Sequence, residues 1–529
     1  MKNFNLKQME FSLSKILFTV GLLWLLRFIY KFFVRPYLLL QDVKRLKGAV
    51  CVFRPFFGVY PEYDRNFVNH NDFFYTIKKR LRENEGMRFF ATPLMENLTF
   101  EVYDPELVKE FTAKAAKSFE KDLRVYGVMP NLVRTGIGFT EQEKWKYQRK
   151  MLSQIFHFDY MNACIPLVNR ISTGWVARYC KDQKSVVEVN EAFKMYAAEI
   201  VFNVFFGEDS FYTIPNAKKA VLTALKVMED MLKLAQSPQN LIFGPRFIDW
   251  KLGKREREYI SDNRFLREYF TDLLYTYKKK YESAKASAQS EQKPWKTLIE
   301  CLLEEAPKSG LSEKDFEIEM LSEILTFFLG GIDTTSNSLA MAQYYLSLHP
   351  EIQDKLRDEI NTSISSDEPV TRDHIMNLPY LNAVYKEILR LSPPASILLP
   401  RRALEDVTLG DLKVKKDSSV MVSIVGVHHN PSIYPNPEVF NPDRWLEKTE
   451  AGTSNPYAAI PFSIGQRKCI GEQLALIEAK TMIIEIVRKF RVSLKQPFTL
   501  KMIQTLTYQH HGPMDIIFER IQEIYKKDQ

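Results

Sequence analysis

The stretch Phe462-Ser463-Ile464-Gly465-Gln466-Arg467-Lys468-Cys469-Ile470-Gly471 decides the fold of this chain of 529 residues. A single cysteine lies between two glycines, and a predicted helix, 472–490, follows at once. Gly465 has no Cβ and lets the backbone approach a flat cofactor, while amides at a helix start favour a thiolate. Phe462 is placed to shield the sulfur, and Arg467 to bind a carboxylate at the cofactor's edge. The pattern suits a thiolate bound to iron, against the plain alternative of a buried free cysteine.

This stretch resembles the haem-thiolate loop of the cytochrome P450 family. The resemblance implies that Cys469 is the proximal ligand to the iron of haem b, and that the site holds neither zinc nor an iron–sulfur cluster. A thiolate ligand pushes electron density into the iron and favours cleavage of the O–O bond. Phe462, Gly465 and Arg467 are then expected to contact the haem.

A second motif, Gly330-Gly331-Ile332-Asp333-Thr334-Thr335, lies in the middle of a long helix predicted from about 312 to 347. Two glycines inside a helix cost about 1 kcal/mol each relative to alanine. Approach of a flat ligand, a bulge in the hydrogen-bond ladder or close helix packing would each explain them. With a bulge, Thr334 would donate its hydroxyl into the groove rather than back to the helix, and Asp333 would relay protons from solvent.

The same motif resembles the oxygen-side helix of the cytochrome P450 family. The resemblance implies that Gly330 contacts the haem and that Asp333 and Thr334 form the catalytic pair that delivers protons to bound oxygen. Relatives that only rearrange peroxides or dehydrate oximes often lack this pair. Its presence therefore favours a monooxygenase.

Further motifs resemble structural and haem-edge positions of the family. Glu387 and Arg390 lie at i and i+3 on one predicted helix face, with an ordinary surface pair as the alternative. The resemblance implies that they meet Arg444, in Asn441-Pro442-Asp443-Arg444-Trp445, as a buried structural group.

Trp145 and Arg149, at i and i+4 on a predicted helix 140–154, could both reach one carboxylate. The resemblance implies that they bind one haem propionate and that Arg467 and Arg401 bind the same edge. The adjacent Arg402 is the alternative to Arg401. Five motifs thus follow the family's order from Trp145 to Cys469.

Composition agrees with one large catalytic unit, because 45% of the residues are hydrophobic and no Gly/Ser- or Pro-rich linker divides the chain. Five scattered cysteines without CxxC spacing favour a reducing compartment. The net charge of +8 suits an anionic membrane or an acidic protein partner. Without an RNA-binding signature or a basic tail, nucleic acid is a poor candidate partner. The pairs His428-His429 and His510-His511 lack metal-ligand spacing and are interpreted as surface or strand positions.

Helical periodicity dominates from residue 60 onward, and the segment 285–295 is polar and predicted to be a loop. Short strands are expected at 407–409, 412–414, 419–424, 491–494 and 514–518. We therefore predict a mainly α protein, with the cytochrome P450 fold of a large helical domain and a small β subdomain. The predicted division is an N-terminal membrane anchor, 1–35, and a haem-thiolate catalytic domain, 36–529.

The N-terminal run 11–34 reaches the roughly 20 apolar residues of a membrane span only if Lys15, Arg27 and Lys31 extend to the interfaces. An amphipathic helix lying at the interface is the alternative. Basic residues just downstream of this run predict that the rest of the protein lies on the cytoplasmic side of the membrane. With the resemblance, this predicts an endoplasmic reticulum membrane protein whose catalytic domain faces the cytoplasm.

The family's topology implies an apolar distal pocket lined by Thr326, Leu329, Ile397 and Leu398, with the loop 123–140 and a hairpin near 509–511. The apolar segment 241–250 predicts either a second membrane contact or a buried element under the pocket roof. Which lipophilic molecule the pocket takes, and the oligomeric state, stay open.

The chain carries no flavin or nicotinamide fingerprint, so its electrons must come from another protein. The resemblance implies NADPH as the indirect source through NADPH–cytochrome P450 reductase, docked on a basic face that includes Lys468, with cytochrome b5 as an optional further partner. The predicted function is insertion of one oxygen atom from O2 into a lipophilic substrate. The alternatives are a haem-thiolate isomerase or dehydratase of the same fold, and a non-catalytic haem-binding protein.

Overall fold

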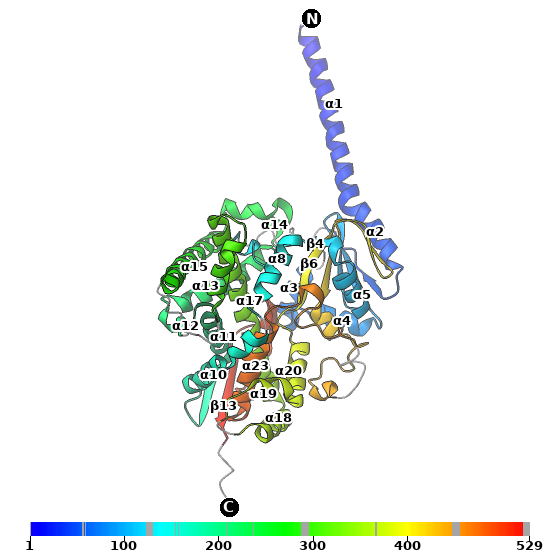
Figure 1. Cartoon of the computed structure of the whole chain (residues 1–529). Helices are drawn as coiled ribbons and strands as arrows, with labels where there is room; N and C mark the ends of the chain where they lie inside the picture. The colour runs from blue at the N-terminus through cyan, green and yellow to red at the C-terminus, as the bar shows by residue number, and fades with distance from the viewer. Residues whose placement is uncertain are drawn as a thin grey trace, which may run out of the picture.

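The computed structural model describes residues 2–55, 58, 60–122, 131–153, 155–156, 158–207, 209–235, 237–286, 296–365, 368–446 and 455–521. Figure 1 shows a mainly helical body with strands in two separate regions, one near the base of the long N-terminal helix and one near the C-terminus. The N-terminal helix projects out of the body. This arrangement confirms the predicted fold class.

The helices of the N-terminal half are α1 (Lys2–Ile29), α2 (Arg35–Lys44), α3 (Tyr60–His70), α4 (Tyr75–Glu83), α5 (Pro105–Lys109), α7 (Asn131–Arg134), α8 (Gln142–Ser153), α9 (Phe158–Ala163), α10 (Ile165–Tyr179), α11 (Val189–Phe206), α12 (Ser210–Thr213), α13 (Ala217–Ala235) and α14 (Pro238–Phe243). Those of the C-terminal half are α15 (Lys254–Ala286), α16 (Leu298–Glu305), α17 (Glu313–Leu348), α18 (Pro350–Ser363), α19 (Arg372–Asn377), α20 (Pro379–Leu391), α21 (Ile424–His428) and α23 (Glu472–Val487).

The strands of the described residues form four sheets. The largest has the order β1-β2-β3-β9-β6-β4 and combines β1 (Ala49–Cys51), β2 (Phe89–Leu94), β3 (Asn97–Val102), β4 (Phe119–Lys121), β6 (Ile397–Ala403) and β9 (Ser419–Ser423). The others pair β5 (Lys184–Glu188) and β10 (Phe490–Leu494) with β13 (Asp515–Arg520), β7 (Val407–Leu409) with β8 (Leu412–Val414), and β11 (Met502–Gln504) with β12 (Tyr508–His510).

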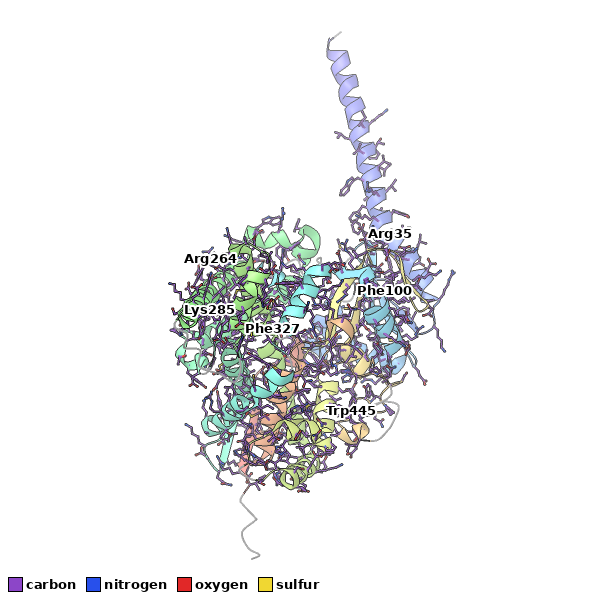
Figure 2. The ribbon with its side chains drawn as sticks, viewed as in Figure 1. Arg35, Phe100, Arg264, Lys285, Phe327 and Trp445 are labelled. Atoms are coloured by element: carbon purple, nitrogen blue, oxygen red, sulfur yellow. The ribbon has the colours of Figure 1, made fainter. Side chains whose placement is uncertain are left out.

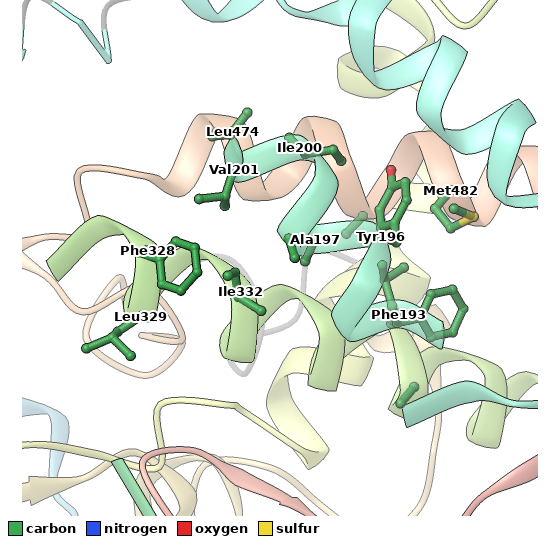
Figure 3. Packing of buried hydrophobic residues seen from close by; sticks show 14 of the residues in the cluster. Phe193, Tyr196, Ala197, Ile200, Val201, Phe328, Leu329, Ile332, Leu474 and Met482 are labelled. Carbon is green, nitrogen blue, oxygen red and sulfur yellow. The ribbon is translucent and has the colours of Figure 1, made fainter. Parts of the chain in front are cut away.

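The central element is α17, whose 36 residues correspond to a length of roughly 54 Å. The Ser312 hydroxyl caps its start by accepting from the Asp315 amide at 3.2 Å, and the helix ends at His349, before Pro350. Figure 3 shows α17 packed against α11. Rings of Phe202 and Phe328 meet edge to face across this contact, with centroids 5.4 Å apart. A helix buried along most of its length thus forms a rigid base for the site motif at its centre.

The N-terminal helix joins the body without a break. A short π-helical turn, Tyr30–Val34, links α1 to α2, and α2 packs against the first strands of the large sheet. Lys31 forms an ion pair with Glu96 at 2.5 Å, and Arg35 donates to the backbone carbonyl of Glu96 at 2.9 Å. Figure 2 shows Arg35 where α1 reaches the body. Within the described residues, one helical stretch, 15–44, is long and apolar enough to cross a membrane, and its apolar window is fully exposed.

The structure departs from the sequence predictions about local structure at three places. The chain beyond residue 60 is mainly helical as predicted, but the fully buried strands β2 and β3, which pair in the N-terminal half, were not predicted. His428 and His429 are not surface or strand positions; they lie buried at the end of α21, where burial lowers the pKa of His428 to about 3. Of the predicted polar loop 285–295, residues 285 and 286 belong to α15, and 287–295 lie outside the described residues.

Candidate functional site

The cysteine loop is closed by backbone hydrogen bonds. The Cys469 amide donates to the Phe462 carbonyl at 2.9 Å, and the Lys468 amide donates to the Gly465 carbonyl at 3.1 Å. Gly465 has a φ of +75°, and a Cβ there would lie 3.2 Å from the carbonyl oxygen of Thr112. Glycine is therefore required by backbone conformation and by close packing at this turn. The loop holds Cys469 directly before α23, as the sequence predicts.

Cys469 is the one exposed cysteine of the five. The other four are buried or half-buried, and burial raises their pKa values, to about 11 for Cys51 and Cys301 and about 12 for Cys164 and Cys180. Only Cys469 thus presents its thiol to a ligand.

The protein environment by itself does not favour the Cys469 thiolate. Burial of the surrounding loop raises the pKa of the Cys469 thiol, and the Gly471 amide and the charge of Arg149 offset this only in part. The Gly471 amide lowers the pKa of this thiol, in the direction that the sequence predicts for the helix start, but burial is the larger effect. A coordinated metal ion deprotonates a thiol outright, so thiolate character here depends on the ligand.

The two glycines of α17 serve different purposes. A Cβ on Gly331 would lie 2.9 Å from the Val201 side chain of α11, so this glycine permits close helix packing. A Cβ on Gly330 would meet nothing within 4 Å, and Gly330 is exposed although its neighbour Leu329 is buried. Figure 3 shows Val201 on the α11 side of α17 and Leu329 pointing away from α11. Gly330 thus leaves one face of the central helix open to a flat ligand.

The acid and threonine of this motif do not adopt the predicted arrangement. α17 is continuous through the motif, without a bulge, and the Thr334 hydroxyl donates back to the Gly330 carbonyl at 2.6 Å. Asp333 is 3% exposed and accepts a hydrogen bond from the Thr507 hydroxyl at 2.5 Å. Burial raises the pKa of Asp333. The carboxyl is therefore enclosed by protein, and its predicted role in relaying protons stays a prediction.

A group of basic side chains gathers beside the cysteine loop. Arg467 stacks over the Trp145 ring at 4.0 Å, donates to the Thr140 carbonyl at 3.0 Å and forms an ion pair with Glu141. Arg149 donates to the Lys468 carbonyl at 2.9 Å, which ties α8 to the loop. The structure therefore brings together Trp145, Arg149 and Arg467 as the sequence predicts.

Lys121, on β4, joins this basic group and was not found from the sequence. Its ammonium is buried, 3.2 Å from the Thr140 carbonyl and 3.5 Å from Glu141. Burial, and then repulsion from Arg467 and Arg401, lowers the pKa of Lys121 to about 7. Burial and neighbouring cations, offset in part by Glu141, likewise lower the pKa of Arg467 to about 10. A surplus of positive charge of this kind fits an anionic ligand such as a pair of propionates.

The structure separates the two adjacent arginines of β6. Arg402 pairs with Glu120 and with Asp417, the latter at 3.0 Å, and so is held by acidic partners. Arg401 is the one whose charge acts on Lys121 and Arg467. Its position therefore agrees with the preferred assignment at the haem edge.

The predicted structural group is present in full. Arg390 donates to both carboxylate oxygens of Glu387 at 2.8 Å, and Arg444 donates to Glu387 Oε1 at 3.0 Å. The Trp445 indole adds a further bond to Glu387 Oε2 at 2.9 Å. Burial raises the pKa of Glu387, but the two guanidinium groups outweigh it and hold that pKa below its ordinary value. This group joins α20 to the segment 441–445; Figure 2 labels Trp445 there.

The predicted pocket-lining residues lie on two elements. Thr326 and Leu329 lie on α17, where the Thr326 side chain touches the 131–140 segment, since a Cβ on Gly136 would lie 2.3 Å from its hydroxyl. Ile397 and Leu398 are half-buried at the start of β6. Of the predicted lining loop, 123–140, residues 123–130 lie outside the described residues.

The residues present fit an iron porphyrin better than a metal ion held by protein ligands alone. Among the described residues, no group of three or more His, Cys, Asp or Glu side chains is arranged to hold a metal ion. The accessible thiol matches the iron ligand of a haem, and the open glycine face on α17 matches its flat ring. The surplus of cations beside the thiol loop matches its acidic edge.

Comparisons with known proteins agree with this chemistry. A family model described as Cytochrome P450 matches residues 52–517. Cytochrome P450 4X1 of Homo sapiens is 27% identical over 403 residues, covering 74% of this chain and 76% of that protein. Cytochrome P450 3A25 of Mus musculus is 28% identical over 417 residues, covering 74% and 76%. The solved cytochrome P450DA heme domain is similar in fold, with a TM-score of 0.73 at 21% identity, covering 90% of this chain and 99% of that chain.

Proposed function

Given that the chain belongs to the cytochrome P450 family of haem-thiolate monooxygenases, we propose that it inserts one oxygen atom from O2 into a lipophilic organic substrate. NADPH supplies the electrons through NADPH–cytochrome P450 reductase, with cytochrome b5 as an optional second donor. The observation that carries this proposal is the accessible Cys469 thiol combined with an intact Asp333–Thr334 pair beside the open face at Gly330.

The haem, as haem b, supplies the reductive activation of O2 when it is bound. Cys469 holds the iron, and Gly330, Phe462 and Gly465 border the ring. Trp145, Arg149, Arg401 and Arg467 bind the propionates, and buried Lys121 adds a further positive charge to that edge. The crowding of cations supports this assignment. Burial and then the charge of Arg467 lower the pKa of Lys121, and burial together with Arg401 and Arg149 lowers that of Arg467, so an anion at this edge would relieve the repulsion.

Asp333 and Thr334 move protons on the distal side. The Thr334 hydroxyl, anchored on the Gly330 carbonyl, faces the open side of α17 and can accept a hydrogen bond there. Burial raises the pKa of the Asp333 carboxyl, which favours the protonated form that can donate a proton. Thr326, Leu329, Ile397 and Leu398 orient an apolar substrate and exclude water from it.

The chain is anchored in the endoplasmic reticulum membrane by residues 1–35, with the catalytic domain, 36–529, on the cytoplasmic face. The exposed apolar helix supports this placement. A second contact with the membrane is made by the side chains of Phe243, Trp250 and Leu252, which are 57%, 53% and 76% exposed. Figure 1 shows α14, which ends at Phe243, at the same end of the body as α1. Phe247 and Ile248 of the same segment are buried, so the proposed membrane contact is limited to the exposed side chains.

The reductase docks on the face that carries the cysteine loop. Lys144 and Lys468 are exposed there, although each also forms an ion pair, with Glu319 and Glu472. Exposed basic side chains steer an acidic partner toward this side.

The proposed reaction is tested with isotope-labelled O2. We expect the full chain, reconstituted with haem, reductase and NADPH, to convert a member of a panel of long-chain fatty acids and steroids into a product that carries one labelled oxygen. Conversion of a lipid hydroperoxide without NADPH, and without label from O2, would instead identify an isomerase or dehydratase.

The haem-edge assignment predicts unequal effects of two neighbouring substitutions. Arg401→Gln should weaken haem retention, because it removes a cation from the propionate edge. Arg402→Gln removes the same charge from a residue held by Glu120 and Asp417 and should leave haem retention close to the wild-type level. The measurement is the rate of haem transfer to apomyoglobin; equal rates for the two variants would contradict the assignment.

A further inference from the structure

The carboxyl group of Asp333 is held by the hairpin that β11 and β12 form near the C-terminus. Thr507 lies at the tip between β11 and β12, and its hydroxyl donates to Asp333 Oδ2 at 2.5 Å. The Asn337 amide, one turn further along α17, donates to the same threonine oxygen at 2.6 Å. Asp333, Asn337 and Thr507 are 3%, 4% and 2% exposed. A buried, fully bonded polar group of this kind fixes the orientation of its members.

The same hairpin is bonded to residues 394–396, which lead directly into β6, the strand that lines the predicted substrate pocket. The Ser396 hydroxyl donates to Gln504 at the end of β11, and the Tyr508 amide donates to the Pro394 carbonyl at 2.9 Å. Ile397 and Leu398 follow directly. Leu506, at the hairpin tip, packs on the main hydrophobic core. One small element thus contacts both the substrate-facing strand and the proton-delivering acid.

We propose that Thr507 is a positioning residue that holds Asp333 in its working orientation and links filling of the substrate pocket to proton delivery. This inference rests on the proposed monooxygenase function. An apolar ligand packed against the start of β6 and the hairpin tip restrains the hairpin. A restrained Thr507 and Asn337 then hold the Asp333 carboxyl in one position relative to the adjacent Thr334.

Other charged groups act on Asp333 only from a distance. Lys194 of α11 attracts the carboxylate and Glu229 of α13 repels it. Thr507, in contrast, is hydrogen-bonded to the Asp333 carboxylate. Loss of the Thr507 hydroxyl should therefore disturb the orientation of the acid more than loss of a distant charge.

Three variants of the full chain distinguish a role of Thr507 in positioning Asp333 from a role in packing alone. Thr507→Val removes the hydroxyl and keeps the shape, and Thr507→Ser keeps the hydroxyl. Thr505→Val makes the same change two residues away, where the hydroxyl accepts from Gln509 and donates to the Thr507 backbone carbonyl, both within the hairpin and neither on α17. With reductase and NADPH, we expect Thr507→Val to release several-fold more hydrogen peroxide per NADPH than the wild type. Thr507→Ser and Thr505→Val should stay near the wild-type value, and equal values for all four proteins would overturn the proposal.

Hydrogen–deuterium exchange of the segment 502–510 provides a readout that needs no turnover. We expect faster exchange in Thr507→Val and in Asp333→Ala than in Thr505→Val, because the first two break the bond to α17. The azole 4-phenylimidazole, which fills haem pockets, should slow exchange of this segment in the wild type. Unchanged exchange in both variants, or no effect of the azole, would overturn the link. A wild type that consumes no NADPH would instead count against the proposed function, while exchange would still decide the role of Thr507.

Discussion

Glu387→Ala is expected to lower the free energy of unfolding by about 3–5 kcal/mol and to yield protein that retains little haem. The carboxylate is fully buried and accepts bonds from Arg390, Arg444, Trp445 and the Asn441 amide. Alanine would leave two buried guanidinium groups without their acidic partner, which costs far more than a broken surface pair. The measurement is denaturant unfolding followed by far-UV circular dichroism, together with haem content.

The matched control is Glu438→Ala. Glu438 pairs with Arg82 at 3.2 Å, and both side chains are nearly half exposed, so the expected loss is about 0–1 kcal/mol. Because the folded pKa of Glu387 lies below its ordinary value, its contribution is fully present at neutral pH and is lost as the pH falls through the acid range. Similar losses for both variants at neutral pH would contradict the structural role of the buried group.

Cys469→Ser is expected to abolish NADPH-dependent oxygenation while leaving the fold intact. The side chain is exposed on its loop, so its replacement removes little buried area. A serine hydroxyl is a harder and far less acidic ligand, so it cannot supply the electron density that a thiolate gives to iron. Product formation and the thermal unfolding midpoint are measured in parallel.

Cys301→Ser is the control for this substitution. Cys301 is half-buried on α16, and burial raises the pKa of its thiol to about 11, so no ligand role is expected. We expect this variant to keep its activity. Oxygenation that survives Cys469→Ser, or is lost equally in Cys301→Ser, would contradict the assignment of Cys469.

Local patterns predicted much of the fold. β7 and β8 lie at the predicted residues, and α17 lies within about one residue of its predicted span, because cap and turn residues mark these ends in the sequence. β2 and β3 were missed because both are completely buried and lack the alternation that identifies a half-exposed strand. Their sheet also depends on β9, more than 300 residues away, through a parallel pairing that no local pattern shows.

The residues of the candidate site also divide into those that the sequence predicted and those that it did not. Cys469, Glu387 and Trp145 belong to short motifs whose chemistry is visible in the residues themselves. Lys121 and Thr507 are isolated in sequence and become functional candidates only when folding brings them to Glu141 and Asp333. The orientation of Thr334 was predicted wrongly because an unbroken helix offers its hydroxyl a carbonyl four residues back.

The most direct test of the central claim is the absorption spectrum of the reduced, carbon-monoxide-bound protein, recorded for the wild type beside Cys469→Ser. We predict the band characteristic of thiolate-ligated haem in the wild type and its loss in the variant. A well-folded wild type that shows only the shorter-wavelength band of histidine-ligated haem would contradict Cys469 as the iron ligand.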